Sequence, residues 1–598
     1  SPVWAATPKT TDSTVETSND VNTPYSEIKV TTTNGAPAVA IKAVESKQLQ
    51  VYLTDNNSVA AEATVDSSVT GYNAYASGLY VYGDGASLAV TPALNVTATA
   101  TNTRTDYNVY SEANGIYNYA SDGTNSLTTA GLTVNAEASG AYTFAYGLRN
   151  KTYSSSDAAT ITVNGASTIT ATATASEANC NKYLSASGIY NDGEQAEVKL
   201  NGAATIKAAI TGATDSGDHS EISDATAVYN RLGTITANGK LDLTATATGG
   251  QTQTGEPSVE AYGIYNEGTA NVIKDLTINA SATGGIAPAT TIVTTNAYGI
   301  NNTTGGTVTV AGVTNITAAG RANTNNVDGT NDVMVNGIAN RTSTMTLQDK
   351  ATITATVGSS AEATAIAVAN IGSTLNTNDL ILKATADGVE LKAASAAKYN
   401  SIKATGLDNE ESTLDTGNIS LDISASGGSL AADATAKKIS VTATGLYNND
   451  STAKPSVSVG TVSGTVTATG ASAASKGKDS SVNAYGINND TGSLTAAGTD
   501  LTVTATGSYG EELSSTEAVG ILSGTNGKDV TVTGTSKLNV AITVAGTAGL
   551  TESGAYGVRL RSGADTSTVT LGDVTGSVQA LTATGAVIGG YGILGAIG

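Results

Sequence analysis

The chain is built from short segments in which apolar and small polar residues alternate. Residues 241–248 read Leu-Asp-Leu-Thr-Ala-Thr-Ala-Thr, and residues 501–506 read Leu-Thr-Val-Thr-Ala-Thr. Strict alternation over such a stretch is typical of a half-buried strand. Thr, Val and Gly are poor helix formers, and no apolar stripe recurs every 3.6 positions. The pattern therefore predicts strands throughout and disfavours helices.

A short phrase recurs between these segments, as in residues 187–191 (Ser-Gly-Ile-Tyr-Asn) and 485–489 (Tyr-Gly-Ile-Asn-Asn). Its Gly, replaced by Ala in two copies, is always followed by an aliphatic residue. The copies are centred on Gly78, Gly115, Gly147, Gly188, Ala227, Gly263, Gly299, Gly337, Ala367, Gly406, Gly445, Gly486, Gly520, Gly557 and Gly592. Their spacing runs from 30 to 41 residues and averages about 37, so residues 71–598 form one repeat domain. A degenerate copy lies near Ala40 and Ile41.

Three short strands for each copy of the phrase are typical of an all-β parallel β-helix, or solenoid. Each strand is expected to pair with its equivalent one repeat away, which stacks identical side chains about 4.8 Å apart. One rung per repeat predicts about fifteen rungs, with loops such as 211–225 and 249–260 before the next phrase. Residues 1–70 lack a clear phrase and are interpreted as an N-terminal leader or cap.

An Asn stands three positions after the Gly in consecutive copies of the phrase. We interpret this set as a structural ladder inside the solenoid, because Asn tolerates the left-handed turn between sheets and its amide can bond the next rung. A row of metal or sugar ligands is the alternative, but ligand sites are local and this ladder is uniform. The ladder comprises Asn118, Asn150, Asn191, Asn230, Asn266, Asn302, Asn340, Asn370, Asn409, Asn448 and Asn489.

Tyr recurs both two positions after the Gly, as at Tyr190 and Tyr265, and one position before it, as at Tyr146 and Tyr262. In a regular strand these two positions have opposite parity, so one is expected to face inward and the other outward. The favoured interpretation is stacking between rungs that tightens the aliphatic core. The alternative is an exposed aromatic strip that binds a glycan or a partner surface.

The composition argues against several classes of function. With 29 Lys+Arg against 51 Asp+Glu the formal net charge is −22, which disfavours nucleic acid and anionic membranes as partners. A single His and a single Cys exclude a multi-His centre and an internal disulfide. No catalytic, cofactor-binding or metal-binding residue is predicted, and no cofactor. Near the start, Val3 and Ala5 fit either the remnant of a signal peptide or an ordinary flexible terminus.

Isolated candidates for chemistry carry little weight. His219 lies in a short acidic loop that matches neither a catalytic triad nor a known calcium repeat. The clusters Asp408/Glu410/Glu411 with Asp415, and Glu511/Glu512, could serve a polysaccharide-cleaving solenoid. Such an enzyme needs one differentiated cleft, whereas each repeat here resembles the next. Cys180 has no nearby His in the sequence and is interpreted as a free thiol.

The Gly-Ile-Tyr-Asn phrases, the Thr/Val/Ala strands, the near absence of Cys and the acidic charge resemble the passenger domain of a bacterial autotransporter (type V secretion) adhesin. The resemblance covers about residues 70–598. It implies a right-handed parallel β-helix, exported by a signal peptide and displayed at the cell surface. It also implies attachment to a host or bacterial surface ligand (glycan or protein), or self-association and biofilm formation, with no nucleic acid partner.

The sequence lacks the C-terminal membrane barrel of that family, so contact with the outer membrane is expected only through a missing segment, and the chain is interpreted as a truncated passenger. A polysaccharide lyase or glycoside hydrolase on the same solenoid, and a self-assembling surface layer or filament, remain the alternatives.

Overall fold

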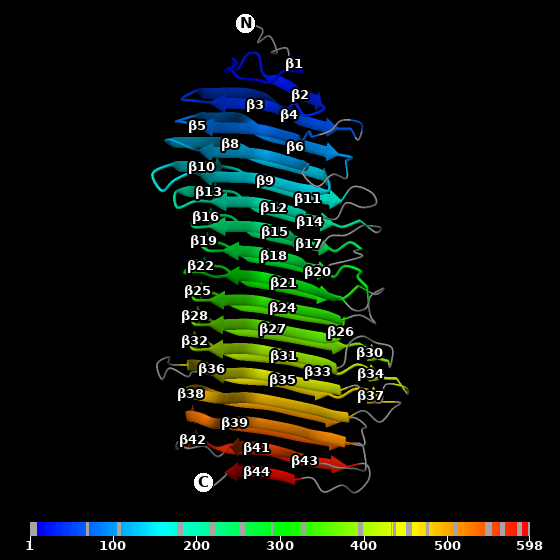
Figure 1. Ribbon diagram of the computed structural model, residues 1–598. Helices are drawn as coiled ribbons and strands as arrows, with labels where there is room; N and C mark the ends of the chain where they lie inside the picture. The colour runs from blue at the N-terminus through cyan, green and yellow to red at the C-terminus, as the bar shows by residue number, and fades with distance from the viewer. Residues whose placement is uncertain are drawn as a thin grey trace. The chain divides into compact units, whose positions relative to one another are not determined.

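The computed structural model describes residues 9–66, 68, 71–104, 109–175, 183–213, 222–251, 258–288, 291–323, 330–392, 399–431, 433, 438–449, 457–473, 478–507, 512–544, 553–561, 568–582 and 589–595. Every regular element in this part of the chain is a β-strand (Figure 1). The chain divides into two compact units, residues 1–281 with 305–313 and residues 282–304 with 314–598. The expectation of an all-β fold is confirmed.

The first unit is a stack of turns in which each phrase lies on a strand, here called a phrase strand. Its phrase strands are β3 (Ala38–Val44), β5 (Ala74–Gly83), β7 (Tyr110–Ala120), β9 (Tyr142–Thr152), β12 (Tyr183–Asp192), β15 (Ile222–Arg231) and β18 (Ser258–Asn266). A short second strand follows in each turn, as in β10 (Ala158–Val163), β13 (Ala196–Leu200), β16 (Thr234–Ala237), β19 (Thr269–Val272) and β22 (Thr307–Val310). The third strands are β11 (Ser167–Ala175), β14 (Ala204–Thr211), β17 (Leu241–Thr248) and most of β20 (Leu276–Thr283).

In the earliest turns of this unit the second and third strands run together. These long strands are β4 (Gln48–Val65), β6 (Ser87–Asn102) and β8 (Thr124–Gly140), and they are preceded by β1 (Lys9–Thr11) and β2 (Tyr25–Thr33). β3 pairs in parallel with β5, and Ile41 lies opposite Leu79. The parallel pairing therefore includes the degenerate phrase at Ala40 and Ile41 and begins within residues 1–70.

The second unit repeats the arrangement. Its phrase strands are β21 (Ile292–Asn302), β24 (Thr330–Arg341), β27 (Glu362–Ile371), β31 (Tyr399–Glu410), β35 (Lys438–Asn449), β41 (Gly554–Leu560) and β44 (Gly589–Gly595). The other two strand positions are filled by β23 (Thr314–Arg321), β25 (Thr344–Leu347), β26 (Ala351–Ser360), β28 (Thr374–Thr377), β29 (Leu380–Gly388), β32 (Thr413–Thr416), β33 (Ile419–Ser426), β40 (Ser536–Val544), β42 (Thr568–Leu571) and β43 (Val574–Thr582). Several positions merge in β36 (Val457–Thr469), β38 (Lys478–Gly507) and β39 (Glu512–Val532), and a small separate sheet contains β30 (Glu390–Leu391), β34 (Ser429–Leu430) and β37 (Ser472–Ala473).

Within each unit, equivalent residues of successive turns lie side by side. β12 pairs in parallel with β15, so that Tyr190 lies opposite Tyr229 and Asn191 opposite Asn230. In the second unit β27 pairs with β31, and Asn370 lies opposite Asn409. These registers confirm the parallel solenoid with one rung per repeat.

The solenoid has about 12 turns of about 37 residues, slightly fewer than the fifteen expected. The last copy of the phrase, at Gly592, forms β44, which is the last strand described and is not followed by the other two strands of a turn among the described residues. The expected loops are also shorter than 211–225 and 249–260, because Ala225 already lies in β15 and Glu260 in β18.

The core is made of aliphatic side chains from every strand. In β17 exposure alternates strictly between buried and half-buried residues, as the sequence pattern predicts. Gly147 is buried where its phrase strand approaches the third strand closely. A Cβ atom there would collide with the side chain of Ile169 and the carbonyl oxygen of Gly188. Most copies of the phrase therefore have Gly at this position, and the two exceptions, Ala227 and Ala367, carry the smallest side chain there.

Candidate functional site

Two columns of polar or aromatic side chains run along the phrase strands, one inside the solenoid and one outside. The inner column consists of the eleven asparagines, all of them fully buried. The outer column consists largely of tyrosines and charged residues.

In the first unit each inner amide donates to the next one. Asn118 Nδ2 donates to Asn150 Oδ1 at 2.9 Å, and Asn150 Nδ2 donates to Asn191 Oδ1 at 2.8 Å. The same bond joins Asn191 to Asn230 and Asn230 to Asn266, both at 2.8 Å. The amides therefore point one way, from the N-terminal turn toward the C-terminal turn.

The second unit contains an equivalent row. Asn302 Nδ2 donates to Asn340 Oδ1 and Asn340 Nδ2 to Asn370 Oδ1, each at 2.9 Å. The row continues through Asn409 and Asn448, with bonds of 2.9 and 3.0 Å, and reaches Asn489 Oδ1 at 2.7 Å. These asparagines thus serve the same purpose in both units.

The inner amides also satisfy the backbone of the turn that follows each phrase strand. Asn191 Nδ2 donates to the carbonyl of Ala196, and Asn230 Nδ2 to that of Gly233, both at 3.0 Å. The expected left-handed conformation does not fall on the Asn. It falls two residues later, where Gly193 has φ 121° and Leu232 has φ 63°. The Asn stays in the strand because its side chain must point inward to meet the next amide.

Full burial has a direct chemical consequence for the ladder. A sugar or a metal ion arriving from solvent cannot touch side chains with no exposed surface, so the geometry favours the structural role. The row begins at Asn118, whose Oδ1 has no partner among the described residues. Val81 lies opposite Asn118 in the preceding turn and has no amide to donate.

The outer column differs from the sequence expectation. Both tyrosine positions face outward: the rings of Tyr262 and Tyr265, three residues apart in one strand, lie 5.6 Å apart and nearly perpendicular. Likewise Tyr146 lies 5.4 Å from Tyr190, which follows its own Gly in the next turn. The parity argument was wrong because the Gly and the aliphatic residue after it are both directed into the core, which shifts the alternation by one.

Stacking between turns, by contrast, is present on this outer face. The rings of Tyr190 and Tyr229 are 4.8 Å apart with an interplanar angle of 4°, and those of Tyr229 and Tyr265 are 5.1 Å apart at 7°. The hydroxyls of Tyr190 and Tyr265 donate to carboxylates two residues further along the chain, Asp192 Oδ2 at 3.3 Å and Glu267 Oε1 at 2.7 Å. Burial raises the pKa of Tyr190, Tyr229 and Tyr265 above the ordinary value of 10.0, so these phenols stay protonated at neutral pH.

Charged side chains fill other positions of the outer column. The guanidinium of Arg149 lies over the rings of Tyr117 and Tyr146, at 4.8 and 4.6 Å, and its Nη1 donates to Glu112 Oε1 at 2.6 Å. Arg231 bonds Asp192 through two nitrogens, at 2.7 and 2.9 Å. Sequence reasoning missed these pairs, although their alignment with the tyrosines in the repeat would have indicated them.

Two carboxyl groups on phrase strands are protonated more easily than usual. Burial raises the pKa of Asp224 to about 6, against hydrogen bonds from Tyr183 and Ser185 that lower it. Burial also raises the pKa of Asp408 to about 6, with Lys403 lowering it; Lys403 Nζ lies 4.0 Å away. Asp224 lies in the first unit and Asp408 in the second.

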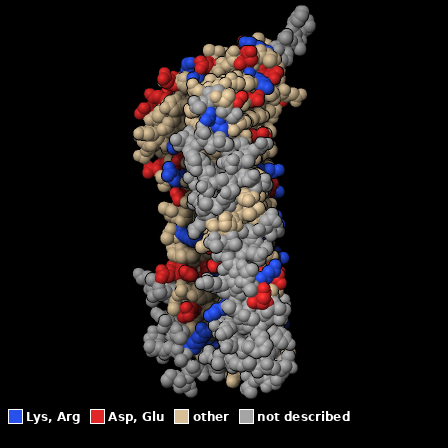
Figure 2. Space-filling model, turned by 45° about the vertical axis from the view of Figure 1, so that its right-hand side comes forward, with Lys and Arg blue, Asp and Glu red and all other residues tan. Residues whose placement is uncertain are grey.

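The remaining sequence candidates form no centre. His219, Cys180 and Glu511 lie outside the described residues. In the described ranges no three His, Cys, Asp or Glu side chains are grouped so as to hold a metal ion, and no helix there has the length and apolar character to cross a bilayer. Figure 2 shows acidic and basic side chains in small mixed groups over the described part of one face.

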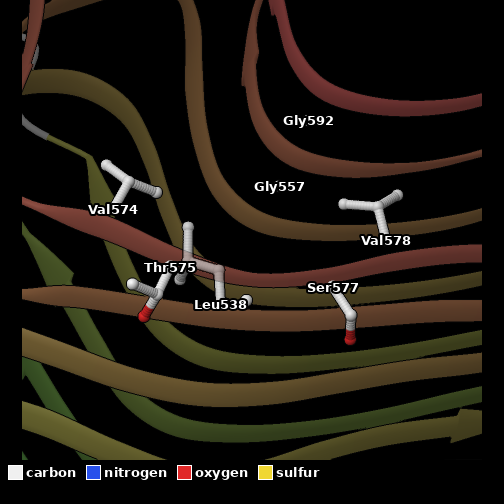
Figure 3. Close-up of a pocket in the computed structure, with 8 residues that line it drawn as sticks. Leu538, Gly557, Val574, Thr575, Ser577, Val578 and Gly592 are labelled. Carbon is white, nitrogen blue, oxygen red and sulfur yellow. The ribbon is translucent and has the colours of Figure 1, made fainter.

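A hollow of about 400 Å³ lies in the second unit, between β40, β41, β43 and β44 (Figure 3). Val574, Thr575 and Val578 line it from β43, and Leu538 from β40. Val574 is 46% exposed, whereas its partner one turn earlier, Ser536, is fully buried. The hollow is thus the interior of the last described turn, and its lining contains no titratable group.

Comparison with known proteins gave no relative: no family model, no curated protein and no solved structure matches the chain. The arrangement of the described residues is therefore the basis for a functional conclusion.

Proposed function

We propose that the chain is a bacterial cell-surface structural adhesin of the autotransporter passenger type. In this proposal it is exported and mediates attachment, self-association or biofilm formation. The observation that carries the proposal is the repeated outer column of half-buried tyrosines, held in register by a fully buried amide ladder. A scaffold of this kind presents tyrosines and charged side chains at many of its turns, which suits many weak contacts that act together.

The proposed partner is a glycan or protein on a host or bacterial surface, or a second copy of the chain. Phenol hydroxyls, carboxylates and guanidinium groups alternate along the outer column and can exchange hydrogen bonds with a polar surface. Aromatic rings add apolar contact area at a small entropic cost, which is why Tyr is frequent where proteins bind. No catalytic activity is part of the proposal, and no nucleic acid partner.

Surface display tests the adhesin directly. A non-clumping bacterial strain that displays the chain should settle or attach to a surface, and purified chain added in excess should block the effect. Turnover of a polysaccharide by the purified chain, lost on substitution of Asp224 or Asp408, would instead favour the enzyme alternative. Ordered sheets or filaments of purified chain in electron micrographs would favour the surface-layer alternative.

A further inference from the structure

In the outer column of the first unit, the position before the phrase Gly holds a Tyr in some turns and a small polar residue in others. Tyr146 stands one position before the phrase Gly. Its ring fills the space beside Arg149, and Tyr146 is only 8% exposed. One turn earlier the equivalent residue is Asn114, and two turns earlier it is Ser77. Both side chains are much smaller than Tyr, so the space that a ring occupies at Tyr146 is left open.

The open space is a cleft of about 360 Å³. Tyr75, Tyr80 and Tyr117 line it together with the polar groups of Lys42, Glu112 and Asn114. The rings of Tyr80 and Tyr117 lie 5.4 Å apart at 64°, and Tyr75 is 38% exposed. The volume falls within the roughly 300–1,000 Å³ of small-molecule sites, which combine aromatic walls with a few fixed polar groups.

Asn114 provides an independent indication of a ligand. Its side chain is only 3% exposed. Its Nδ2 donates to Glu112 Oε1 at 2.9 Å, but its Oδ1 is buried and has no hydrogen-bond partner. An unpaired buried acceptor costs about 1–3 kcal/mol. A hydroxyl group bound in the cleft would remove that cost.

The polar groups of the cleft are already held in place. Glu112 Oε1 also accepts from Arg149 Nη1 at 2.6 Å, and Lys42 Nζ lies 3.4 Å from Glu16 Oε1. An ammonium group on β3 and a carboxylate on β7, both lining the cleft, favour a ligand without net charge that both donates and accepts hydrogen bonds. The middle of the cleft is formed by β5, which is paired on both sides, by β3 and by β7. A peptide therefore finds no free strand edge here to extend.

We infer that this cleft binds a neutral oligosaccharide. A pyranose ring has one face of C–H groups, which packs on a tyrosine ring, and a rim of hydroxyls that both donate and accept. One hydroxyl donates to Asn114 Oδ1, and others bond Glu112 and Lys42. The inference rests on the proposed adhesive function, for which it names the ligand class and the place where it binds.

The test titrates the purified chain with cellotetraose, maltotetraose and an N-acetyllactosamine tetrasaccharide by calorimetry and by saturation-transfer NMR. We expect at least one of them to bind, with saturation transfer to the C–H face of the sugar. The variants Asn114→Tyr and Ser77→Tyr fill the cleft with the side chain that the chain itself uses at Tyr146. Each should weaken binding at least tenfold without lowering the melting temperature by more than a few degrees.

Thr205→Tyr is the matched control, because it adds the same ring to the half-buried outer side of β14. It should bind as the parent does. Failure of all three sugars to bind, equal binding by Asn114→Tyr, or binding of unstructured peptides in place of sugars would overturn the inference. A chain that binds no sugar but still clumps cells on display contradicts the cleft alone. One that binds sugar but neither attaches nor clumps contradicts the adhesive function alone.

Discussion

Asn150 donates from Nδ2 to Asn191 Oδ1 at 2.8 Å, although the two residues are 41 positions apart in the chain. Both side chains are fully buried, and each also satisfies a backbone carbonyl of the turn beside it. The ladder thus joins neighbouring turns and compensates the polar backbone inside them. Shifting one turn by a single residue would direct its Asn outward and leave two buried amides unpaired.

The ladder predicts a specific loss of stability. Asn191→Leu leaves Asn230 Oδ1 without the amide that donates to it and the Ala196 carbonyl without its amide partner, and each unpaired group costs about 1–3 kcal/mol. We expect a reduced free energy of unfolding in urea. Asn201→Leu is the control, because Asn201 forms a similar side-chain bond at 3.0 Å on the exposed surface; it should change stability by no more than about 0.5 kcal/mol. Equal effects would contradict the structural role.

The stacked tyrosines should stabilise the outer face. Tyr229 stacks on Tyr190 and on Tyr265, and each aromatic pair contributes about 0.5–1.5 kcal/mol beyond area burial. Tyr229→Ala should therefore lower the free energy of unfolding by about 1–3 kcal/mol, measured by chemical denaturation. Tyr229→Phe keeps the ring and should stay near the parent. A Phe variant as unstable as the Ala variant would show that the hydroxyl, not the stacking, matters.

Much of the fold could be predicted from the sequence because a solenoid repeats its constraints. Gly188 and Asn191 have equivalents three positions apart in other copies of the phrase. Only the pairing of each strand with its equivalent in the next repeat places all of these residues side by side. The directions in which the side chains of the phrase point could not be predicted. Gly147 approaches Ile169 closely, and this shifts the alternation of inward-facing and outward-facing side chains. Ile169 lies on a later strand, β11, so the phrase alone does not indicate the contact.

The candidate site was harder to predict than the fold. The cleft at Asn114 exists because two successive turns have a small residue where the next turn has Tyr146, and this is visible only once Ser77, Asn114 and Tyr146 are placed in register. The sequence gives the residues, but one copy of the phrase alone does not show which of them share a wall.

Asp408 predicts a dependence of stability on pH. Its folded-state pKa of about 6 lies above the ordinary value of 3.8. Between those values the folded chain binds a proton that the unfolded chain has lost, so the free energy of unfolding falls as pH rises from about 4 to 6 and then stays low. Asp408→Asn should make this slope shallower without removing it, because Asp224, with a pKa of about 6, still titrates over the same range. It should also stabilise the chain at pH 7 by about 1–3 kcal/mol.

Asp415→Asn is the control for Asp408, since Asp415 is exposed on the neighbouring β32. It should leave the slope between pH 4 and 6 in place. The comparison is made by urea unfolding at each pH, and an unchanged slope in Asp408→Asn would show that another group titrates.

The pair of Arg231 and Asp192 allows a double-mutant test of the outer column. The carboxylate of Asp192 is 2% exposed, whereas the side chain of Arg231 is 47% exposed, so the two partners are buried unequally. Arg231→Met removes both charge-assisted bonds and leaves a buried carboxylate with Lys151 Nζ at 3.9 Å as its remaining cation. Because that carboxylate loses hydrogen bonds from a charged donor, we expect a loss of about 1–3 kcal/mol in the free energy of unfolding.

Adding Asp192→Asn to Arg231→Met should restore part of the lost free energy of unfolding, since the second change removes the uncompensated charge. If the double variant is as unstable as the sum of the two single variants, the two residues are not coupled, and the pair does not stabilise the outer face.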